Sequence, residues 1–174
     1  MIYIVVALKA EAQAFVDAYK LKKSKLQNFI LFSNATMKLI VSGMGVTNAR
    51  LATQTLINNF DITDDDSYYN IGICAAKNSY AIGETLHIGS IMYEDTLYSF
   101  DEYKKTITCV DEAQDESRYD IADMESYGFY DAVLHNPAIK NYHIIKIVSD
   151  YFQPQSVTKE QAKMLLFHAL KDIF

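Results

Sequence analysis

Short apolar runs alternate with amphipathic stretches along this chain. The runs are rich in β-branched residues and bounded by turn residues, which is typical of buried strands. We expect strands at residues 2–7, 29–32, 38–42, 68–75, 85–93, 106–110 and 143–148. The amphipathic stretches predict helices at residues 9–19, 46–60, 120–135 and 158–173, with Thr158 as the N-cap of the last helix.

This order of elements predicts the fold class. Continuous apolar strands that alternate with helices are typical of α/β proteins, in which helices cover both faces of a central sheet. We therefore predict a three-layer α/β/α sandwich with a mixed sheet, built as a single domain over residues 1–174. In such folds ligands bind outside the carboxyl ends of the strands, and candidate chemistry is sought there.

The composition excludes disorder, because 50% of the 174 residues are apolar and 22% are charged. The 22 acidic residues outnumber the 16 lysines and arginines, which gives a net charge of −6. Arg50 and Arg118 are the only arginines, so the clustered basic surface that nucleic acids require is not expected. No apolar run reaches the ~18 residues of a membrane span, and we predict no membrane partner.

The cysteines and the N-terminus indicate a cytoplasmic protein. Cys74 and Cys109 both lie in apolar runs, which favours buried, reduced thiols over a disulfide scaffold. The apolar N-terminus meets Lys9 and Glu11 at once, unlike the charge order of a signal peptide. The four histidines lack the spacing of metal ligands, so we expect no metal and no cofactor.

Three carboxylates occupy positions where the pattern calls for apolar residues. Glu11 lies on the apolar side of the predicted helix 9–19, and Glu125 on the apolar stripe of the predicted helix 120–135. Asp150 follows a buried strand directly. Burying an unpaired charge costs several kcal/mol, so these groups need a ligand, a water molecule or a cation. For Glu11, a role in the first turn of its helix is the alternative.

Two glycine-containing segments are candidates for a close approach of the backbone to a ligand. Ser42-Gly43-Met44-Gly45 joins a strand to a helix, and Asn70-Ile71-Gly72 ends another core run. The first turn has two interpretations that the sequence leaves open. It is either a close turn that feeds the helix, or a set of backbone N–H groups directed at an anion or a nucleophilic water. The acidic residues at 62–66 are expected to form a solvated loop.

Together these segments resemble the nucleoside phosphorylase / nucleosidase superfamily, in the family's order and over nearly the whole chain. The superfamily includes purine nucleoside phosphorylases and methylthioadenosine/S-adenosylhomocysteine nucleosidases. The matching stretches are Ala7-Leu8-Lys9-Ala10-Glu11-Ala12, Val41-Ser42-Gly43-Met44-Gly45, Asn70-Ile71-Gly72, Ala122-Asp123-Met124-Glu125-Ser126 and Val148-Ser149-Asp150. Asp-Met-Glu followed downstream by Ser-Asp is the most specific part of the resemblance.

The resemblance implies a role for each site residue. Asp150 would be the general acid that protonates the departing purine, and Ser149 would hold its geometry. Glu125 would bind the ribose hydroxyls and stabilise an oxocarbenium-like sugar, while Met124 would pack against the ribose. Glu11 would orient or deprotonate the attacking water.

Further substrate contacts are expected from the glycine turn and the fourth strand. These residues are Gly43, Met44, Gly72, Cys74 and Ala75. Arg50 is the candidate for holding an anion, and Tyr151 and Phe152 either flank the base or belong to the core, which we favour.

The chain departs from the family pattern in two places. It is several tens of residues shorter than typical members, and the shortfall lies between Gly89 and Asp123. The usual glycine-rich sequence after the fourth strand is here Cys74-Ala75-Ala76. Because phosphorylases hold phosphate with arginines, the scarcity of arginine favours water as the nucleophile.

The resulting prediction is a nucleosidase that cleaves the N-glycosidic bond of a purine nucleoside or a 5′-thionucleoside. A purine nucleoside phosphorylase and a nucleoside-binding protein without turnover are the alternatives. The substrate is a small molecule, and the resemblance implies a homo-oligomer, with a dimer favoured.

Overall fold

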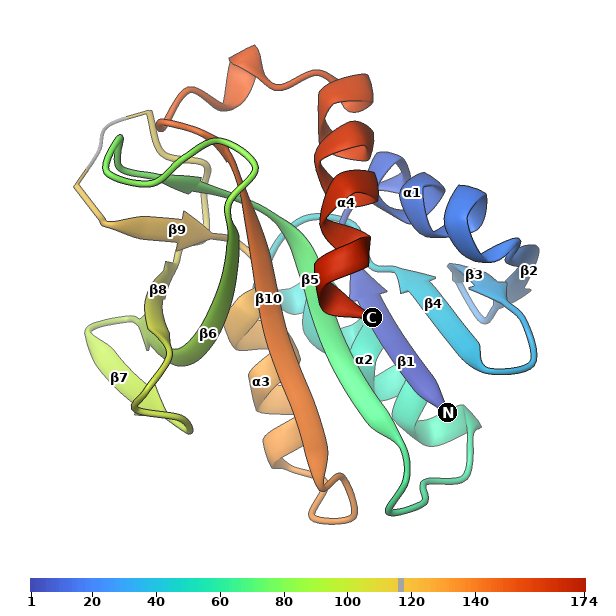
Figure 1. Ribbon diagram of the computed structural model, residues 1–174. Coiled ribbons are helices and arrows are strands. Elements are labelled where there is room, and N and C mark those ends of the chain that lie inside the picture. Colours follow the sequence, from blue (N-terminus) through green and yellow to red (C-terminus); the bar gives the residue numbers. More distant parts are fainter. Residues whose placement is uncertain (116–117) are drawn as a thin grey trace.

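The computed structural model describes residues 1–115 and 118–174 as four α-helices, one short 3-10 helix and ten strands (Figure 1). The helices are α1 (Lys9–Tyr19), α2 (Val46–Asn59), α3 (Ser126–Leu134) and α4 (Lys159–Ile173), with the 3-10 helix at Pro154–Ser156. The strands are β1 (Ile2–Val6), β2 (Lys22–Leu26), β3 (Phe29–Ser33), β4 (Met37–Val41), β5 (Ser67–Ala76), β6 (Thr85–Tyr93), β7 (Thr96–Ser99), β8 (Lys105–Cys109), β9 (Ile121–Asp123) and β10 (Asn141–Asp150).

One mixed sheet runs through the molecule and curls back on itself at one side. Its strand order is β10-β6-β8-β9-β5-β1-β4-β3-β2, with β7 paired to β6. Strand β10 also pairs with β5, so β10, β6, β8, β9 and β5 form a closed ring of strand pairings. Strands β4, β1, β5 and β10 are parallel neighbours, and their carboxyl ends therefore lie at the same edge.

Helices cover both faces of the flatter part of the sheet (Figure 1). Helices α1 and α4 pack together on one face, and α2 and α3 pack together on the other. This is the predicted three-layer α/β/α sandwich with a mixed sheet. In the described residues, no helix is long and apolar enough to cross a membrane.

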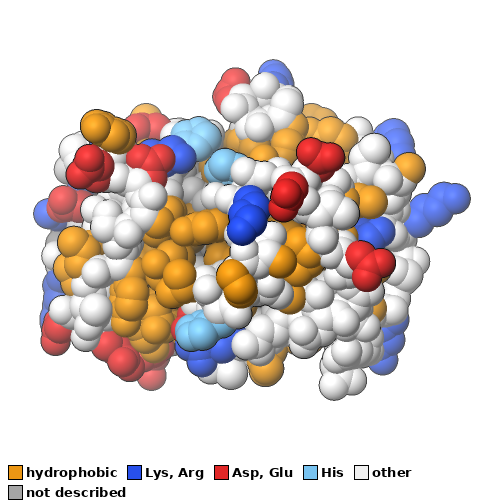
Figure 2. Space-filling view, turned by 90° about the horizontal axis from the view of Figure 1, so that it is seen from below, with side chains coloured by type: hydrophobic (Ala, Val, Ile, Leu, Met, Phe, Trp, Pro, Cys, Tyr) orange, Lys and Arg blue, Asp and Glu red, His pale blue; other side chains and the backbone are white. Residues whose placement is uncertain are grey.

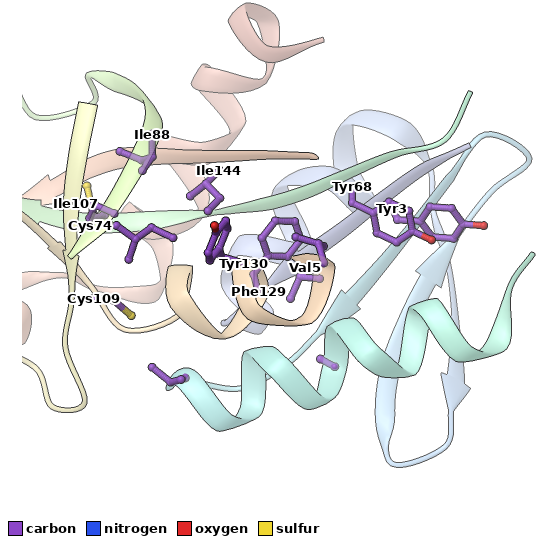
Figure 3. Packing of buried hydrophobic residues seen from close by; sticks show 14 of the residues in the cluster. Tyr3, Val5, Tyr68, Cys74, Ile88, Ile107, Cys109, Phe129, Tyr130 and Ile144 are labelled. Carbon is purple, nitrogen blue, oxygen red and sulfur yellow. The ribbon is translucent and has the colours of Figure 1, made fainter. Parts of the chain in front are cut away.

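Two apolar cores fill the space between these layers. One contains Ile4, Phe15 and Leu166 and lies under α1 and α4. The other lies under α2 and α3, where the rings of Tyr3 and Tyr68 stack with centroids 4.6 Å apart. Figure 3 shows residues of this second core from Tyr3 and Tyr68 at one end, through Phe129 and Tyr130 of α3, to Ile107 and Cys109 at the other end. The packed layers hold the strand ends in fixed positions relative to one another.

The structure confirms most of the predicted elements and adds strands β2, β7 and β9 and the 3-10 helix. Strands β2 and β7 were not predicted, and their sequences KKSKL and TLYS lack a continuous apolar pattern. The 3-10 helix was also not predicted. Thr158 caps α4 as expected, because its side chain accepts the N–H of Gln161 at 3.2 Å.

The predicted helix over residues 120–135 is wrong in its first part. Residues Ile121–Asp123 form strand β9, and the helix begins at Ser126 with Glu125 as its N-cap. Asp123 explains the break, because its carboxylate accepts the backbone N–H groups of Glu125 at 3.2 Å and Ser126 at 2.9 Å. A short acidic side chain that binds nearby N–H groups competes with helix formation and favours a helix start.

The prediction that the acidic loop at 62–66 is solvated is wrong for Asp66. Its side chain is 5% exposed and forms an ion pair with the N-terminal amine at 2.8 Å. Asp66 also accepts the backbone N–H of Thr63 at 2.8 Å. The loop is therefore anchored to the start of β1.

Candidate active site

A cavity of about 240 Å³ opens at the carboxyl ends of β1, β5 and β10, where the fold class places ligands. Most of its wall is apolar. The predicted site residues that line it are Glu11, Met44, Cys74, Ala75, Met124, Glu125, Ser149 and Asp150. Segments from β1, the glycine turn, β5, β9 and β10 thus meet around one space, as the sequence pattern predicts.

Glu11 is buried in the floor of the cavity, with 1% of its surface exposed. Its Oε2 accepts the backbone N–H of Leu8 at 2.8 Å, and its Oε1 accepts that of Ile73 at 2.9 Å. The first contact is the helix-capping role that was the alternative for this residue. The second reaches across to β5, so Glu11 both caps α1 and ties it to the sheet.

The two N–H groups only partly offset the burial of the Glu11 carboxylate. Desolvation raises the pKa of Glu11, while the N–H groups of Ile73 and Leu8 and the charge of Lys146 act in the opposite direction. A buried carboxylate with a raised pKa is suited to accept a proton from an attacking water.

Gly72 makes this position of Glu11 sterically accessible. A Cβ added at residue 72 would lie 2.9 Å from Glu11 Oε1, which is closer than ordinary packing permits. The prediction that Asn70-Ile71-Gly72 ends a strand is wrong, because these residues lie in the middle of β5. Gly72 does not line the cavity itself but leaves room for the side chain that does.

Glu125 lies opposite, at the start of α3, and is 8% exposed. Its Oε1 accepts the backbone N–H of Gly45 at 3.0 Å, which joins α3 to the glycine turn before α2. Gly45 has φ +99°, a backbone conformation that glycine adopts more readily than other residues. In this conformation its N–H donates to Glu125. Burial raises the pKa of Glu125 to about 7, with Lys146 acting against the rise and Asp123 adding to it.

Asp150 ends β10 and is 7% exposed. Its Oδ1 accepts the backbone N–H of Gln153 at 2.7 Å. The hydroxyl of Ser149 lies 2.7 Å from Asp150 Oδ2 and 3.1 Å from the carbonyl oxygen of Cys74. A hydroxyl has one proton, so Ser149 donates to Asp150 when the acid is ionised. When Asp150 carries the proton, Ser149 accepts from it and donates to Cys74 instead.

An ion pair at the cavity wall, in which Asp123 lines the cavity and Lys146 does not, was not predicted from the sequence. Lys146 Nζ lies 2.7 Å from Asp123 Oδ2, and the two side chains are 1% and 0% exposed. The sequence signal was a lysine inside the apolar strand segment Ile144–Val148, because a buried lysine requires an acidic partner. Asp123 was recognised as part of the Asp-Met-Glu motif but was not given a role.

The two aromatic residues after Asp150 behave differently. Phe152 is 1% exposed and lines the cavity, so it belongs to the core and to the candidate site at once. Tyr151 is 41% exposed, and its hydroxyl donates to the carbonyl oxygen of Tyr80 at 3.0 Å. The expectation of a core aromatic therefore fits Phe152 and is wrong for Tyr151.

Two further predicted residues lie outside the cavity lining. Gly43 has φ +85° and donates its N–H to the carbonyl oxygen of Ala7 at 3.1 Å, which fastens the turn to the end of β1. Arg50 Nε pairs with Asp131 Oδ2 at 2.7 Å, between α2 and α3. Among the described lining residues, Lys159 is the only cation.

The stretch between Gly89 and Asp123 still contributes a wall. Val110, Ala113, Gln114 and Ala122 line the cavity from this region. The opposite wall comes from Pro154, Val157 and the start of α4. The cavity thus has a charged floor and mostly apolar sides, an arrangement suited to a flat, weakly polar ligand with hydroxyl groups at one end.

No protein-family model matches the chain, and no curated protein sequence matches it. Solved structures do match over its whole length. The methylthioadenosine/S-adenosylhomocysteine nucleosidase of Helicobacter pylori aligns with a TM-score of 0.81 at 10% identity, over 99% of this chain and 96% of that one. The futalosine hydrolase of H. pylori aligns with a TM-score of 0.80 at 11% identity, over 99% and 94%.

A plant enzyme gives the same result. The 5′-methylthioadenosine nucleosidase of Arabidopsis thaliana aligns with a TM-score of 0.75 at 16% identity, over 99% of this chain and 95% of that one. The three alignments agree in covering both helical layers and the sheet between them, as coverage near the full length requires. The chain therefore has the fold of the nucleoside phosphorylase and nucleosidase proteins.

Proposed function

We propose that the chain hydrolyses the N-glycosidic bond of a purine nucleoside or a 5′-thionucleoside. The observation that carries this proposal is the meeting of three buried carboxylates, Glu11, Glu125 and Asp150, around one largely apolar cavity. Cleavage of this bond leaves positive charge on the ribose and negative charge on the purine. Both charges can be met here by groups that are already in place.

Asp150 acts on the purine. The bond between C1′ and N9 breaks with its electron pair going to the base, and the Asp150 proton moves to N7. Ser149 adjusts to this change, because its hydroxyl proton turns from the Cys74 carbonyl oxygen to the newly ionised Asp150. Phe152 supplies an apolar surface for the base beside Asp150.

Glu125 and Glu11 act on the sugar and the water. Glu125 binds the ribose hydroxyls beside Met124, and its negative charge stabilises the oxocarbenium-like ribose. Glu11 takes a proton from water as the oxygen bonds to C1′, which gives free ribose or its 5′-thio derivative. The backbone N–H groups of Leu8 and Ile73 hold Glu11 in position for that step.

Water rather than phosphate is the nucleophile in this proposal. Arg50 is engaged by Asp131, and the described residues of the cavity lining include no arginine. Several buried carboxylates around the same space also repel a phosphate dianion.

The aligned structures support the substrate class. The H. pylori nucleosidase holds a pyrrolopyrimidine inhibitor with a thioether side chain, and the nucleosidase of Colwellia psychrerythraea holds adenine. The first ligand joins a flat base to an apolar thioether chain, and the second is a flat base alone. The cavity of the present chain offers a carboxylate and an aromatic ring, Asp150 and Phe152, for a base and apolar walls for an extension.

The proposal is tested by incubating the protein with a panel of purine nucleosides and 5′-thionucleosides, with and without phosphate. We expect release of free base that does not depend on phosphate, measured by liquid chromatography. Phosphate-dependent release would assign a phosphorylase instead. Binding measured by calorimetry without any release would assign a nucleoside-binding protein, and the absence of both would overturn the proposal.

The proposal includes a homo-oligomer, with a dimer favoured, that works in the cytoplasm. Exposed leucines at Leu97 on β7 and Leu134 on α3 support an interface on that side of the molecule. Figure 2 views the molecule from below and shows apolar side chains gathered in the left half of this face. Strand β7 and helix α3 lie in the same half in Figure 1. The buried, free Cys74 and Cys109 suit a reducing compartment. Sedimentation velocity measures the assembly state.

A further inference from the structure

Lys146 is a fully buried cation that the proposed reaction does not use. It lies in the middle of β10, 1% exposed, with apolar residues before and after it in the strand. It is not among the described residues that line the cavity, although its partner Asp123 is. A lysine is retained in such a place only when its charge is compensated by close partners.

Asp123 is the direct partner of Lys146, and its carboxylate is fully occupied. Oδ2 lies 2.7 Å from Lys146 Nζ and accepts the backbone N–H groups of Glu125 and Ser126. Oδ1 accepts the hydroxyl of Ser126 at 2.6 Å. Lys146 therefore acts through Asp123 on the backbone that places Glu125 at the start of α3.

We propose that Lys146 and Asp123 form a buried pair that positions Glu125 and sets its charge. This inference rests on the proposed function, in which Glu125 must be negative when it holds the ribose. Lys146 is a positioning residue in this scheme, because it reaches the substrate only through Asp123 and Glu125.

The charged surroundings of Glu125 come from several elements. Glu11 of α1, Asp123 of β9 and Lys146 of β10 act on its charge. The other titratable residues that line the same cavity are Cys74 of β5, Asp150 of β10 and Lys159 of α4. Lys146 favours the anionic form of Glu125, whereas Asp123 and Glu11 oppose it. Removing one member of the pair therefore changes the Glu125 pKa in one direction, and removing the other changes it in the opposite direction.

Two single variants and their combination test this prediction. In Lys146→Met we expect the midpoint of Glu125 ionisation to rise by about one pH unit or more, a tenfold change in proton affinity. In Asp123→Asn we expect it to fall. The double variant Lys146→Met/Asp123→Asn replaces an ion pair by a neutral pair and should return the midpoint toward that of the unchanged protein.

The measurement is a carbon-13 NMR titration of the full chain labelled at glutamate carboxyl carbons, with Glu125→Gln used to assign the signal. The pH dependence of kcat/KM for base release is recorded on the same proteins. A role confined to folding would lower activity without moving the two single variants in opposite directions. If Lys146→Met does not fold, Asp123→Asn and the double variant still provide the comparison.

The outcomes separate this inference from the proposed function. Opposite shifts of the Glu125 signal support the buried pair, even if no nucleoside in the panel is cleaved and hydrolysis is thereby overturned. An unchanged Glu125 midpoint in the variants overturns the pair's role, even if base release is observed. Shifts of both single variants in the same direction overturn it as well.

Discussion

Two cavities of similar size lie along the same strand and differ in how they hold charge. The candidate active site, of about 240 Å³, is at the carboxyl end of β10. The second cavity, of about 230 Å³, is near its start and is lined by His87, Lys104, Lys140, His143 and neighbouring residues. Volume alone does not distinguish the two.

The charges of the second cavity are exposed and locally paired. Lys104 Nζ pairs with Asp101 three residues away at 2.8 Å, and both side chains are about one-third exposed. Lys140 Nζ donates to the carbonyl oxygen of Pro137, again three residues away, at 2.9 Å. Such contacts form wherever the local chain permits and contribute little to stability.

The charges of the active-site cavity are buried and held by distant segments. Glu11 is bonded to a backbone group 62 positions away, and Glu125 to one 80 positions away. These bonds form only when the distant segments are folded together. They hold carboxylates away from water, and the desolvation of each carboxylate lowers the free energy of unfolding. The two cavities therefore differ in buried charge held by tertiary structure, which is typical of functional sites, and not in size.

The largest expected effect comes from Asp150→Asn, which keeps the shape of the side chain but removes its acid. We expect kcat for base release to fall by about 10²–10⁴-fold, the usual contribution of a general acid. Thermal unfolding should change little, because the amide can still accept the N–H of Gln153. Unchanged kcat in Asp150→Asn would contradict the role of Asp150 as the general acid, which is the chemical property proposed to distinguish the first cavity from the second.

The next largest effect is expected from Gly72→Ala, although residue 72 does not line the cavity. The added Cβ forces Glu11 Oε1 away from its place beside the Ile73 N–H. We expect a loss of about 1–3 kcal/mol in unfolding free energy, together with about tenfold lower kcat/KM. Glu11→Gln is the matched variant, since it keeps the volume and removes only the charge. Full activity in Gly72→Ala would contradict the assigned position of Glu11.

The burial of Glu125 predicts a pH dependence of stability. Because its pKa is raised from 4.5 to about 7, its contribution to stability is fully present below about pH 4.5 and is lost as pH rises through 7. One such group changes the unfolding free energy by at most about 1.4 kcal/mol per pH unit. Urea unfolding between pH 5 and 8 should therefore show a steeper decline in the natural chain than in Glu125→Gln. Equal slopes in the two proteins would contradict this prediction.

The smallest effect is expected from Asp101→Asn in the second cavity. Its ion pair is exposed and local, so we expect a change within about 0.5 kcal/mol in unfolding free energy and unchanged kcat/KM. Denaturant unfolding and the base-release assay provide both values. A loss of activity comparable to that of Asp150→Asn would show that the second cavity takes part in function.

The sequence pattern selected three carboxylates that line one cavity, but it did not predict how they are arranged. Glu11 and Asp150 stood out because a charge in an apolar run needs a partner, and both line the cavity. Glu125 was also selected, but as a residue inside a helix, whereas the side-chain bonds of Asp123 make the helix begin only after it, at Ser126. The partner of Lys146 depends on strand pairing between distant segments, which a local pattern does not contain.

The same limit applies to the fold. Apolar strands and amphipathic helices were predicted within a few residues, because burial imposes a period on the sequence. Strand β2 escaped notice, because four of its five residues, KKSK, are polar and exposed at the edge of the sheet. The closure of the ring between β5 and β10 was not predicted either, because two parallel strands separated by the intervening chain leave no local signature.

The place of β10 in that ring has a consequence for how the molecule forms. β10 lies between β5 and β6, and it carries Lys146, Ser149 and Asp150. Without this segment the ring is open, and the edges of β5 and β6 that pair with β10 lack their hydrogen-bond partners. Contacts between such distant segments form slowly. The residues of the candidate site that β10 carries therefore join the others only when the ring closes.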